Sequence, residues 1–197
     1  MSAFLGPIHL WLFKKIKLQN TLINEIYQLS LNEGWIKKDA LDCCGILEDG
    51  ELSEIIDDMN IHGWLQERVD LVEYKLAYLL KLILIDPNRL PKVLDISYKL
   101  GVTLSPKTEI NALDGYKYLD TILLNGMPCD HVLKIISKDE NMIRWGMEID
   151  IHKPYYEEQE FDVSYYYQIR NALIKGVFAS SNLKLTINND FIELRKE

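Results

Sequence analysis

The segment from Ile143 to Ile151 alternates between apolar and polar positions, and this pattern constrains the fold more than any other feature of the chain. Successive side chains of a β-strand point to opposite faces, so the pattern predicts a strand over 142–151 with one buried and one polar face. The apolar face would carry Ile143, Trp145, Met147, Ile149 and Ile151, and the polar face Arg144, Glu148, Asp150 and His152. Such a strand needs a sheet to join and a layer of helices to cover its apolar face.

The sequence after residue 126 predicts a hairpin, a helix and a second hairpin. A helix capped by Asp162 would run to about Ala179, between two pairs of strands. The expected strands are 131–137, 142–151, 183–187 and 191–195, although residues 131–137 also fit one short helix. Two hairpins flanking one helix predict a small, four-stranded antiparallel sheet.

Helical periodicity dominates the chain before residue 126. Pro7 suits the first turn of one helix, and Ser105 with Pro106 would begin another. The expected helices are 7–31, 37–48, 51–85 with a break at Gly63 left open, 90–100 and 106–124. The chain is therefore predicted to form one α+β domain, 1–197, in which a mostly helical part (1–126) packs on the sheet of residues 127–197.

The charge balance of the chain limits its partners. It carries 22 basic and 30 acidic side chains, for a net charge of −8, and such a surface repels phosphate backbones and anionic lipid. We therefore expect neither a nucleic-acid nor a membrane partner. Three cysteines without a secretory segment predict a cytoplasmic protein. Phosphate-binding loops, dinucleotide-binding glycine patterns and the nucleophile elbow of hydrolases are absent from the sequence.

The polar face of the strand over 142–151 is the first candidate site. Arg144, Glu148 and His152 are predicted to bind a ligand, and Asp150 with His152 to hold a metal ion. Just upstream, Cys129 and His131 could act with Asp150 as a nucleophile and proton-transfer groups. The alternative is a solvated sheet face with cross-strand ion pairs.

A second candidate lies on the expected helix 51–85. In a continuous helix, four polar residues would share an apolar face and would need buried partners. They are Asp58, His62, Gln66 and Glu73. His62 could then join Asp150 and His152 at a metal centre, should these residues and His9 converge. The alternative is an Asp58–His62 pair at the rim, with Glu73 either reaching toward solvent or in a salt bridge.

A third candidate is the cluster of tyrosines around the start of the helix after Asp162. Tyr155, Tyr166 and Arg170 could line a pocket for an anionic or planar ligand. The alternative is packing of the helix on the sheet. Cys43 and Cys44 are expected to behave as small hydrophobic residues.

These candidates favour a cytoplasmic small-molecule-binding protein with a polar and aromatic pocket. The ligand of this pocket can be anionic, and the pocket can also hold a divalent metal ion. The first rival is a metal- or cysteine-assisted hydrolase built on Cys129, His131 and Asp150. The second is a self-associating helical interaction module, in which exposed Trp11, Trp35 or Trp64 would anchor a homodimer.

Overall fold

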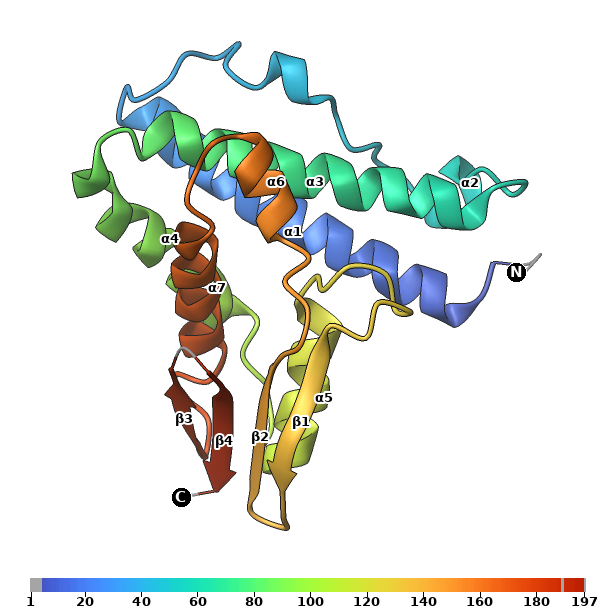
Figure 1. The fold of residues 1–197 in the computed structure, drawn as a ribbon, viewed down its shortest axis with the longest axis vertical. Coiled ribbons are helices and arrows are strands. Elements are labelled where there is room, and N and C mark those ends of the chain that lie inside the picture. The colour runs from blue at the N-terminus through green and yellow to red at the C-terminus, as the bar shows by residue number, and fades with distance from the viewer. Residues whose placement is uncertain (1–4, 189, 197) are drawn as a thin grey trace.

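The computed structural model describes residues 5–188 and 190–196, and it shows the α+β fold that the sequence predicts, with helices mostly N-terminal and the sheet C-terminal (Figure 1). The helices are α1 (Pro7–Asn32), α2 (Leu52–Ile55), α3 (Ile61–Ile83), α4 (Leu90–Thr103), α5 (Ala112–Ile122), α6 (Lys153–Glu158) and α7 (Ser164–Val177), with short turns η1 (Asp42–Cys44) and η2 (Pro87–Arg89). The strands are β1 (Leu133–Lys138), β2 (Met142–Met147), β3 (Leu183–Ile187) and β4 (Ile192–Lys196).

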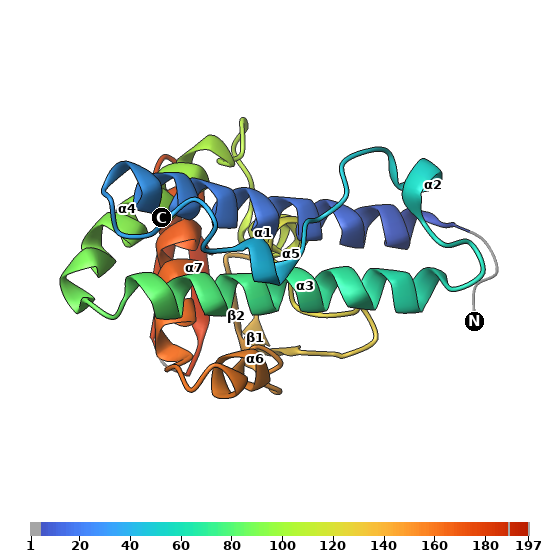
Figure 2. The ribbon, with the colours of Figure 1, turned by 90° about the horizontal axis from the view of Figure 1, so that it is seen from above.

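The long helices α1 and α3 lie side by side and run in the same direction, with the segment between them returning along the pair (Figures 1 and 2). Each helix buries an apolar stripe at helical spacing, which includes Ile16, Ile23 and Ile26 on α1 and Leu65, Leu76 and Leu80 on α3. Burial of these stripes joins the two helices into one layer.

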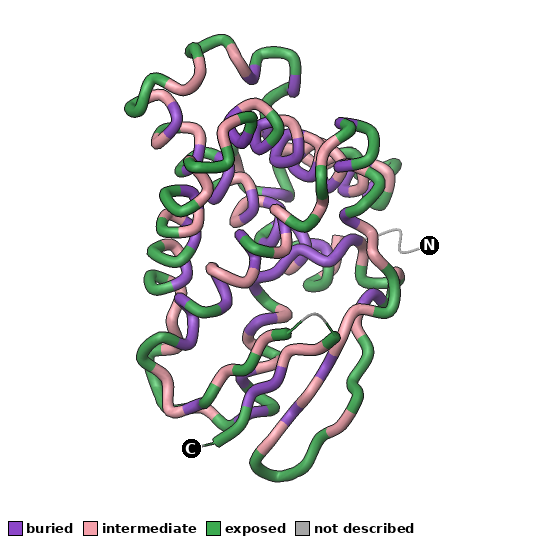
Figure 3. The backbone as a smooth tube through the Cα atoms, turned by 60° about the vertical axis from the view of Figure 1, so that its left-hand side comes forward, coloured by how far each residue is buried: buried purple, intermediate pink, exposed green. Residues whose placement is uncertain are grey.

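The sheet has the strand order β1-β2-β4-β3, and every neighbouring pair is antiparallel. Ile143 and Trp145 on β2 are buried, as the alternation predicts, and α5 and α7 pack against that face. The ring of Tyr116 on α5 meets Trp145 edge-on, with centroids 5.0 Å apart. Figure 3 shows that buried residues gather between the layers, whereas the edge strand β1 is largely exposed.

Two glycines allow α4 and α7 to cross closely. A Cβ added at Gly101 would lie 2.1 Å from the carbonyl oxygen of Leu173, and one added at Gly176 would lie 2.1 Å from that of Tyr98. No larger residue fits at either position without moving a backbone. This crossing fixes α7, and therefore the residues that α7 contributes to the site.

Several predicted boundaries are wrong, each for a local reason. Residues 37–48 contain only the turn η1 instead of a helix, and Gly45 follows it with a φ of 76°. The break in the predicted helix 51–85 falls before Asn60, whose side chain caps α3, so Gly63 lies inside that helix. The helix predicted at 106–124 begins at Ala112 instead of Pro106, because the side chain of Asn111 caps it.

The predicted strand 142–151 is shorter than expected and ends at Met147. Beyond it, a carboxylate oxygen of Asp150 accepts hydrogen bonds from the backbone N–H groups of His152 and Lys153, at 3.1 and 3.0 Å, and α6 begins there. Period-two alternation therefore continues in the sequence after the strand has ended. The helices predicted at 7–31 and 90–100 and both hairpins are confirmed at nearly their predicted positions. No helix among the described residues is long and apolar enough to cross a membrane.

Candidate functional site

A network of buried polar side chains joins α3, α6 and α7, with His152 at its centre. His152 is completely buried, and its Nδ1 lies 3.0 Å from Oε2 of Glu73, which is also buried. Its Nε2 lies 3.1 Å from the hydroxyl of Tyr166 and 3.3 Å from Nη1 of Arg170. Both ring nitrogens of His152 are therefore occupied.

The partners of His152 determine its tautomer. The guanidinium of Arg170 can only donate hydrogen bonds, so Nε2 of His152 must accept. Burial raises the pKa of Tyr166, so this tyrosine keeps its proton and can also donate to Nε2. Nδ1 then carries a proton and donates to Glu73, so the ring of His152 is held in one orientation.

Arg170 is the cation of this network. It is only 6% exposed, and its Nη2 donates to Oδ1 of Asn125 at 2.7 Å. Within the described part of the chain, no carboxylate oxygen lies at ion-pair distance from Arg170. Glu73, the acid of the network, contacts one ring nitrogen of His152, and Arg170 contacts the other. Arg170 is thus fixed in place but not directly neutralised.

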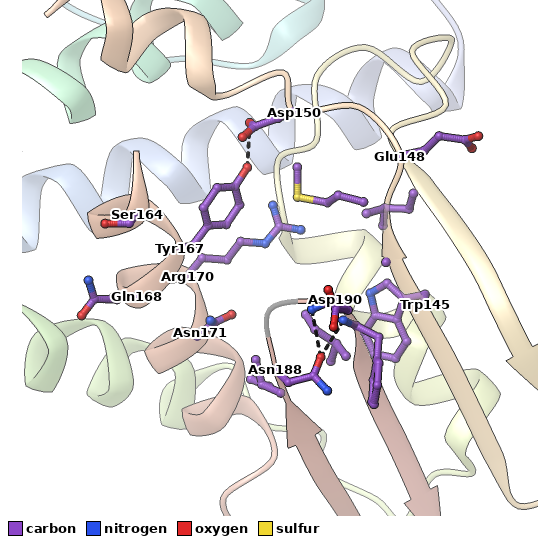
Figure 4. Close-up of a pocket in the computed structure, with 16 residues that line it drawn as sticks. Trp145, Glu148, Asp150, Ser164, Tyr167, Gln168, Arg170, Asn171, Asn188 and Asp190 are labelled. Carbon is purple, nitrogen blue, oxygen red and sulfur yellow. Dashed lines mark hydrogen bonds between the residues drawn. The ribbon is translucent and has the colours of Figure 1, made fainter. Parts of the chain in front are cut away.

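A pocket of about 680 Å³ opens beside this network, between α7, the end of β2 and the β3–β4 turn (Figure 4). Arg170 projects from α7 toward the strands, and Trp145 lies on the opposite wall. Met147 and Phe191 add apolar surface, and Asn171 adds an amide. The volume is in the range of small-molecule sites.

Asp150 and Tyr167 form the edge of this pocket nearest α6. The Tyr167 hydroxyl donates to Oδ1 of Asp150 at 2.7 Å, as Figure 4 shows. Burial, together with this hydrogen bond, raises the pKa of Tyr167, which therefore stays protonated. Asp150 also accepts the two backbone hydrogen bonds that begin α6, so its role in the structure is to position α6 and Tyr167.

Three predicted ligand-binding residues lie elsewhere or only at the rim. Arg144 is on the opposite sheet face, where its Nη2 lies 2.6 Å from Oε2 of the cross-strand residue Glu193. Glu148 lines the pocket but is exposed, 3.6 Å from the Lys134 ammonium. The Tyr155 hydroxyl donates to Asp70, outside the pocket around Arg170. For Arg144, the structure therefore agrees with the alternative given for this strand, a sheet face with cross-strand ion pairs.

The predicted hydrolase residues are not assembled. Cys129 and His131 are both exposed, and Cys129 makes only a long contact, 3.9 Å, to Oδ1 of Asp130. No hydrogen bond connects Cys129, His131 and Asp150 in the part of the chain that the structure describes. The nucleophile, base and orienting acid expected for such an enzyme are thus not in contact.

The histidines form a pair at one place and stand alone elsewhere. Nε2 of His9 and Nε2 of His62 are 3.2 Å apart, where α1 and α3 begin. From His62 to Glu73, the partner of His152, α3 rises about 16 Å, so His62 cannot share a metal ion with His152. Among the described residues, no group of three or more His, Cys, Asp or Glu side chains could hold a metal ion.

The tryptophans proposed as dimer anchors differ in exposure, and two of them are stacked by a cation of the chain. Trp64 is buried, and the guanidinium of Arg68 lies 3.9 Å from the centroid of its ring. The ammonium of Lys15 lies 3.6 Å from the ring of Trp11, and Trp35 is only partly exposed. The expected exposure is therefore wrong for Trp64, whereas Trp11 and Trp35 are partly exposed and the homodimer stays a prediction.

Sequence reasoning identified His152, Tyr166 and Arg170 but not all of their partners. Glu73 was recognised as a polar residue on an apolar helix face, and its burial confirms that observation. The expected polar register was wrong at Asp58, which precedes α3. Asn125 gave no signal, because an Asn followed by Gly indicates a turn in any sequence.

Comparisons of the chain with protein-family models, curated proteins and solved structures found no match. The geometry itself must therefore indicate what the site can do. A fixed, buried guanidinium beside a pocket with apolar walls can bind an anionic group of an organic molecule.

Proposed function

We propose that the protein binds a small organic molecule in the pocket between α7 and the sheet, with an anionic group of the ligand against Arg170. The observation that carries this proposal is the state of Arg170: buried, oriented by Asn125 and His152, and without a carboxylate partner among the described residues. A charge taken out of water is costly unless it is paired, and a ligand anion would supply the missing partner.

The remaining walls of the pocket define the body of the ligand. Trp145, Met147 and Phe191 offer apolar surface, whereas Tyr167 and Asn171 offer polar groups at the α7 side. A planar or partly apolar molecule with one acidic group fits this distribution better than a highly charged one. Glu148 and Asp190 also line the pocket, and they disfavour a ligand with several negative charges.

The contacts of the buried network around His152 support ligand binding better than catalysis. A histidine acting as a general base needs a free ring nitrogen directed at the substrate. In His152, Nδ1 faces Glu73 and Nε2 is covered by Tyr166 and Arg170. His152 therefore serves to position Arg170 and Tyr166. All three cysteines are free thiols, which supports a cytoplasmic location for this binding protein.

The test is a thermal-shift screen of planar organic acids and their neutral amides or esters, followed by calorimetry of the compounds that bind. Arg170→Gln is expected to raise Kd for the acids by roughly 10- to 100-fold, because a hydrogen bond to a charged group contributes about 1.5–3 kcal/mol. Arg68→Gln is the matched control, since Arg68 is a partly buried arginine that is paired with Glu48 and does not line this pocket. Equal binding of the acids by wild type and a folded Arg170→Gln variant would refute the proposal.

A further inference from the structure

The adjacent residues Cys43 and Cys44 hold their sulfur atoms close together at the end of η1, against α3. Their Sγ atoms are 3.7 Å apart, although neighbouring side chains in an extended segment would point to opposite faces. Cys44 is buried, as expected for a small hydrophobic residue, whereas Cys43 is exposed, contrary to that expectation. The positive φ of Gly45 turns the chain directly after the pair.

The distance between the two sulfurs suits a metal ion better than a disulfide. Two Zn–S bonds of about 2.3 Å at a tetrahedral angle place their sulfur atoms roughly 3.8 Å apart. The observed 3.7 Å separation therefore needs almost no adjustment to chelate such an ion. A disulfide would require the sulfurs to approach to about 2.05 Å, which neighbouring residues reach only with distortion.

The surroundings of the pair leave room for an ion, although they favour the protonated thiol of Cys44. An open groove of about 620 Å³ begins at the two cysteines and continues past Tyr74 and Tyr155. Nζ of Lys75 donates to the carbonyl oxygen of Gly45 at 3.0 Å, and its charge opposes the effect of burial, which raises the pKa of Cys44 to about 12. Cys44 is therefore protonated at neutral pH, and a bound cation must displace its proton.

We propose that Cys43 and Cys44 form a two-thiolate chelating site for a thiophilic d10 cation such as Zn²⁺ or Cd²⁺. Each thiol loses its proton to solvent as its metal–sulfur bond forms, and neither sulfur nor metal changes oxidation state. No third His, Cys, Asp or Glu among the described residues completes the site. The other coordination positions are therefore open to water or to a thiol from another molecule.

Cd²⁺ is the direct probe, because its thiolate charge-transfer absorption reports sulfur ligation. We would titrate Cd²⁺ into the full chain carrying Cys129→Ser, which removes the third, isolated thiol and leaves the pair intact. One Cd²⁺ per chain is expected, with affinity lowered on the order of 100-fold or more by Cys43→Ser or Cys44→Ala. Absence of the absorption band, or unchanged affinity in Cys43→Ser, would overturn the proposal.

Phenylarsine oxide provides a second measurement that requires two neighbouring thiols. One arsenic should form two As–S bonds and release one water molecule, so that both thiols disappear from titration with a thiol reagent. The adduct should resist excess glutathione, a monothiol, and be released by dithiothreitol. The chain that keeps only Cys129, through Cys43→Ser and Cys44→Ala, is the matched control and should lose its adduct to glutathione. Equal lability of the two adducts would exclude chelation by the pair.

The cysteine pair is separate from the pocket beside Arg170. None of the residues lining that pocket belongs to the groove at Cys43, so the two sites can be tested independently. Failure of the cadmium titration would leave the proposed small-molecule site unaffected, and loss of ligand binding in Arg170→Gln would not change the cadmium result.

Discussion

Replacement of His152 by alanine should destabilise the fold far more than the size of the side chain suggests. The change removes three contacts: one of 3.0 Å to Glu73, one of 3.1 Å to Tyr166 and one of 3.3 Å to Arg170. The other carboxylate oxygen of Glu73, Oε1, is buried and has no hydrogen-bond partner among the described residues. His152→Ala would therefore leave a buried carboxylate without its one side-chain partner.

The expected cost follows from that uncompensated group. Leaving a buried hydrogen-bonding group without its partner costs about 1–3 kcal/mol, and more for a carboxylate, which is a large share of the roughly 5–15 kcal/mol that holds an ordinary domain together. Glu73→Ala removes the carboxylate itself. In the double variant, neither half is left unpaired, so its cost should fall below the sum of the single costs by about 1–3 kcal/mol.

Equilibrium unfolding in urea, followed by tryptophan fluorescence and circular dichroism, measures these free energies if the m value stays constant. His131→Ala is the control, because His131 is exposed and should cost no more than about 0.5 kcal/mol. Additive costs of His152→Ala and Glu73→Ala, or a His152→Ala variant as stable as His131→Ala, would show that the network does not act as a unit.

Two further predictions concern the sheet and the α4–α7 crossing. The hydrogen bond from Arg144 lowers the pKa of Glu193, so its stabilisation is present above the usual carboxyl range and is lost as the pH falls through the lowered pKa. Arg144→Gln should therefore cost about 1–2 kcal/mol at pH 7 and less near pH 3, and equal losses in urea unfolding at both values would contradict this assignment. Gly101→Ala should lower Tm despite the better helix propensity of alanine, because its Cβ would lie 2.1 Å from the Leu173 carbonyl oxygen. The exposed Val102→Ala should leave Tm almost unchanged, and a Gly101→Ala protein as stable as wild type would show that the crossing can relax.

The elements predicted best from the sequence are those whose pattern is local and repeated. In α1 and in the two hairpins, apolar residues recur at a regular spacing over several turns or residues. The buried residues of these elements follow the same spacing. The predicted helix boundaries were wrong where a single capping side chain determines the start of the helix. Asn60 and Asn111 cap their helices, although Gly63 and Pro106 are stronger signals of a helix boundary in the sequence.

The site was predicted as a set of residue types and not as an arrangement. Alternation placed Arg144 and His152 on one face, but the strand ends between them, and their side chains then have different surroundings. Arg144 remains on the sheet and pairs with Glu193, whereas His152 turns into the helical layer and meets Glu73. The contact between His152 and Glu73 joins α3 to α6, and no period in either segment encodes such a tertiary contact.

The cost of the polar network is itself an argument for function. Four buried side-chain atoms have no hydrogen-bond partner among the described residues, and all four belong to residues in or near this network: Gln19 Nε2, Glu73 Oε1, Asn125 Nδ2 and Tyr156 Oη. Each such group costs on the order of 1–3 kcal/mol, and apolar side chains of similar size would pack the same interface without that penalty. A layer selected only for stability would not retain them. Of these residues, Asn125 accepts a hydrogen bond of 2.7 Å from Arg170 and so fixes the orientation of this cation at the wall of the pocket, which supports the proposed ligand site.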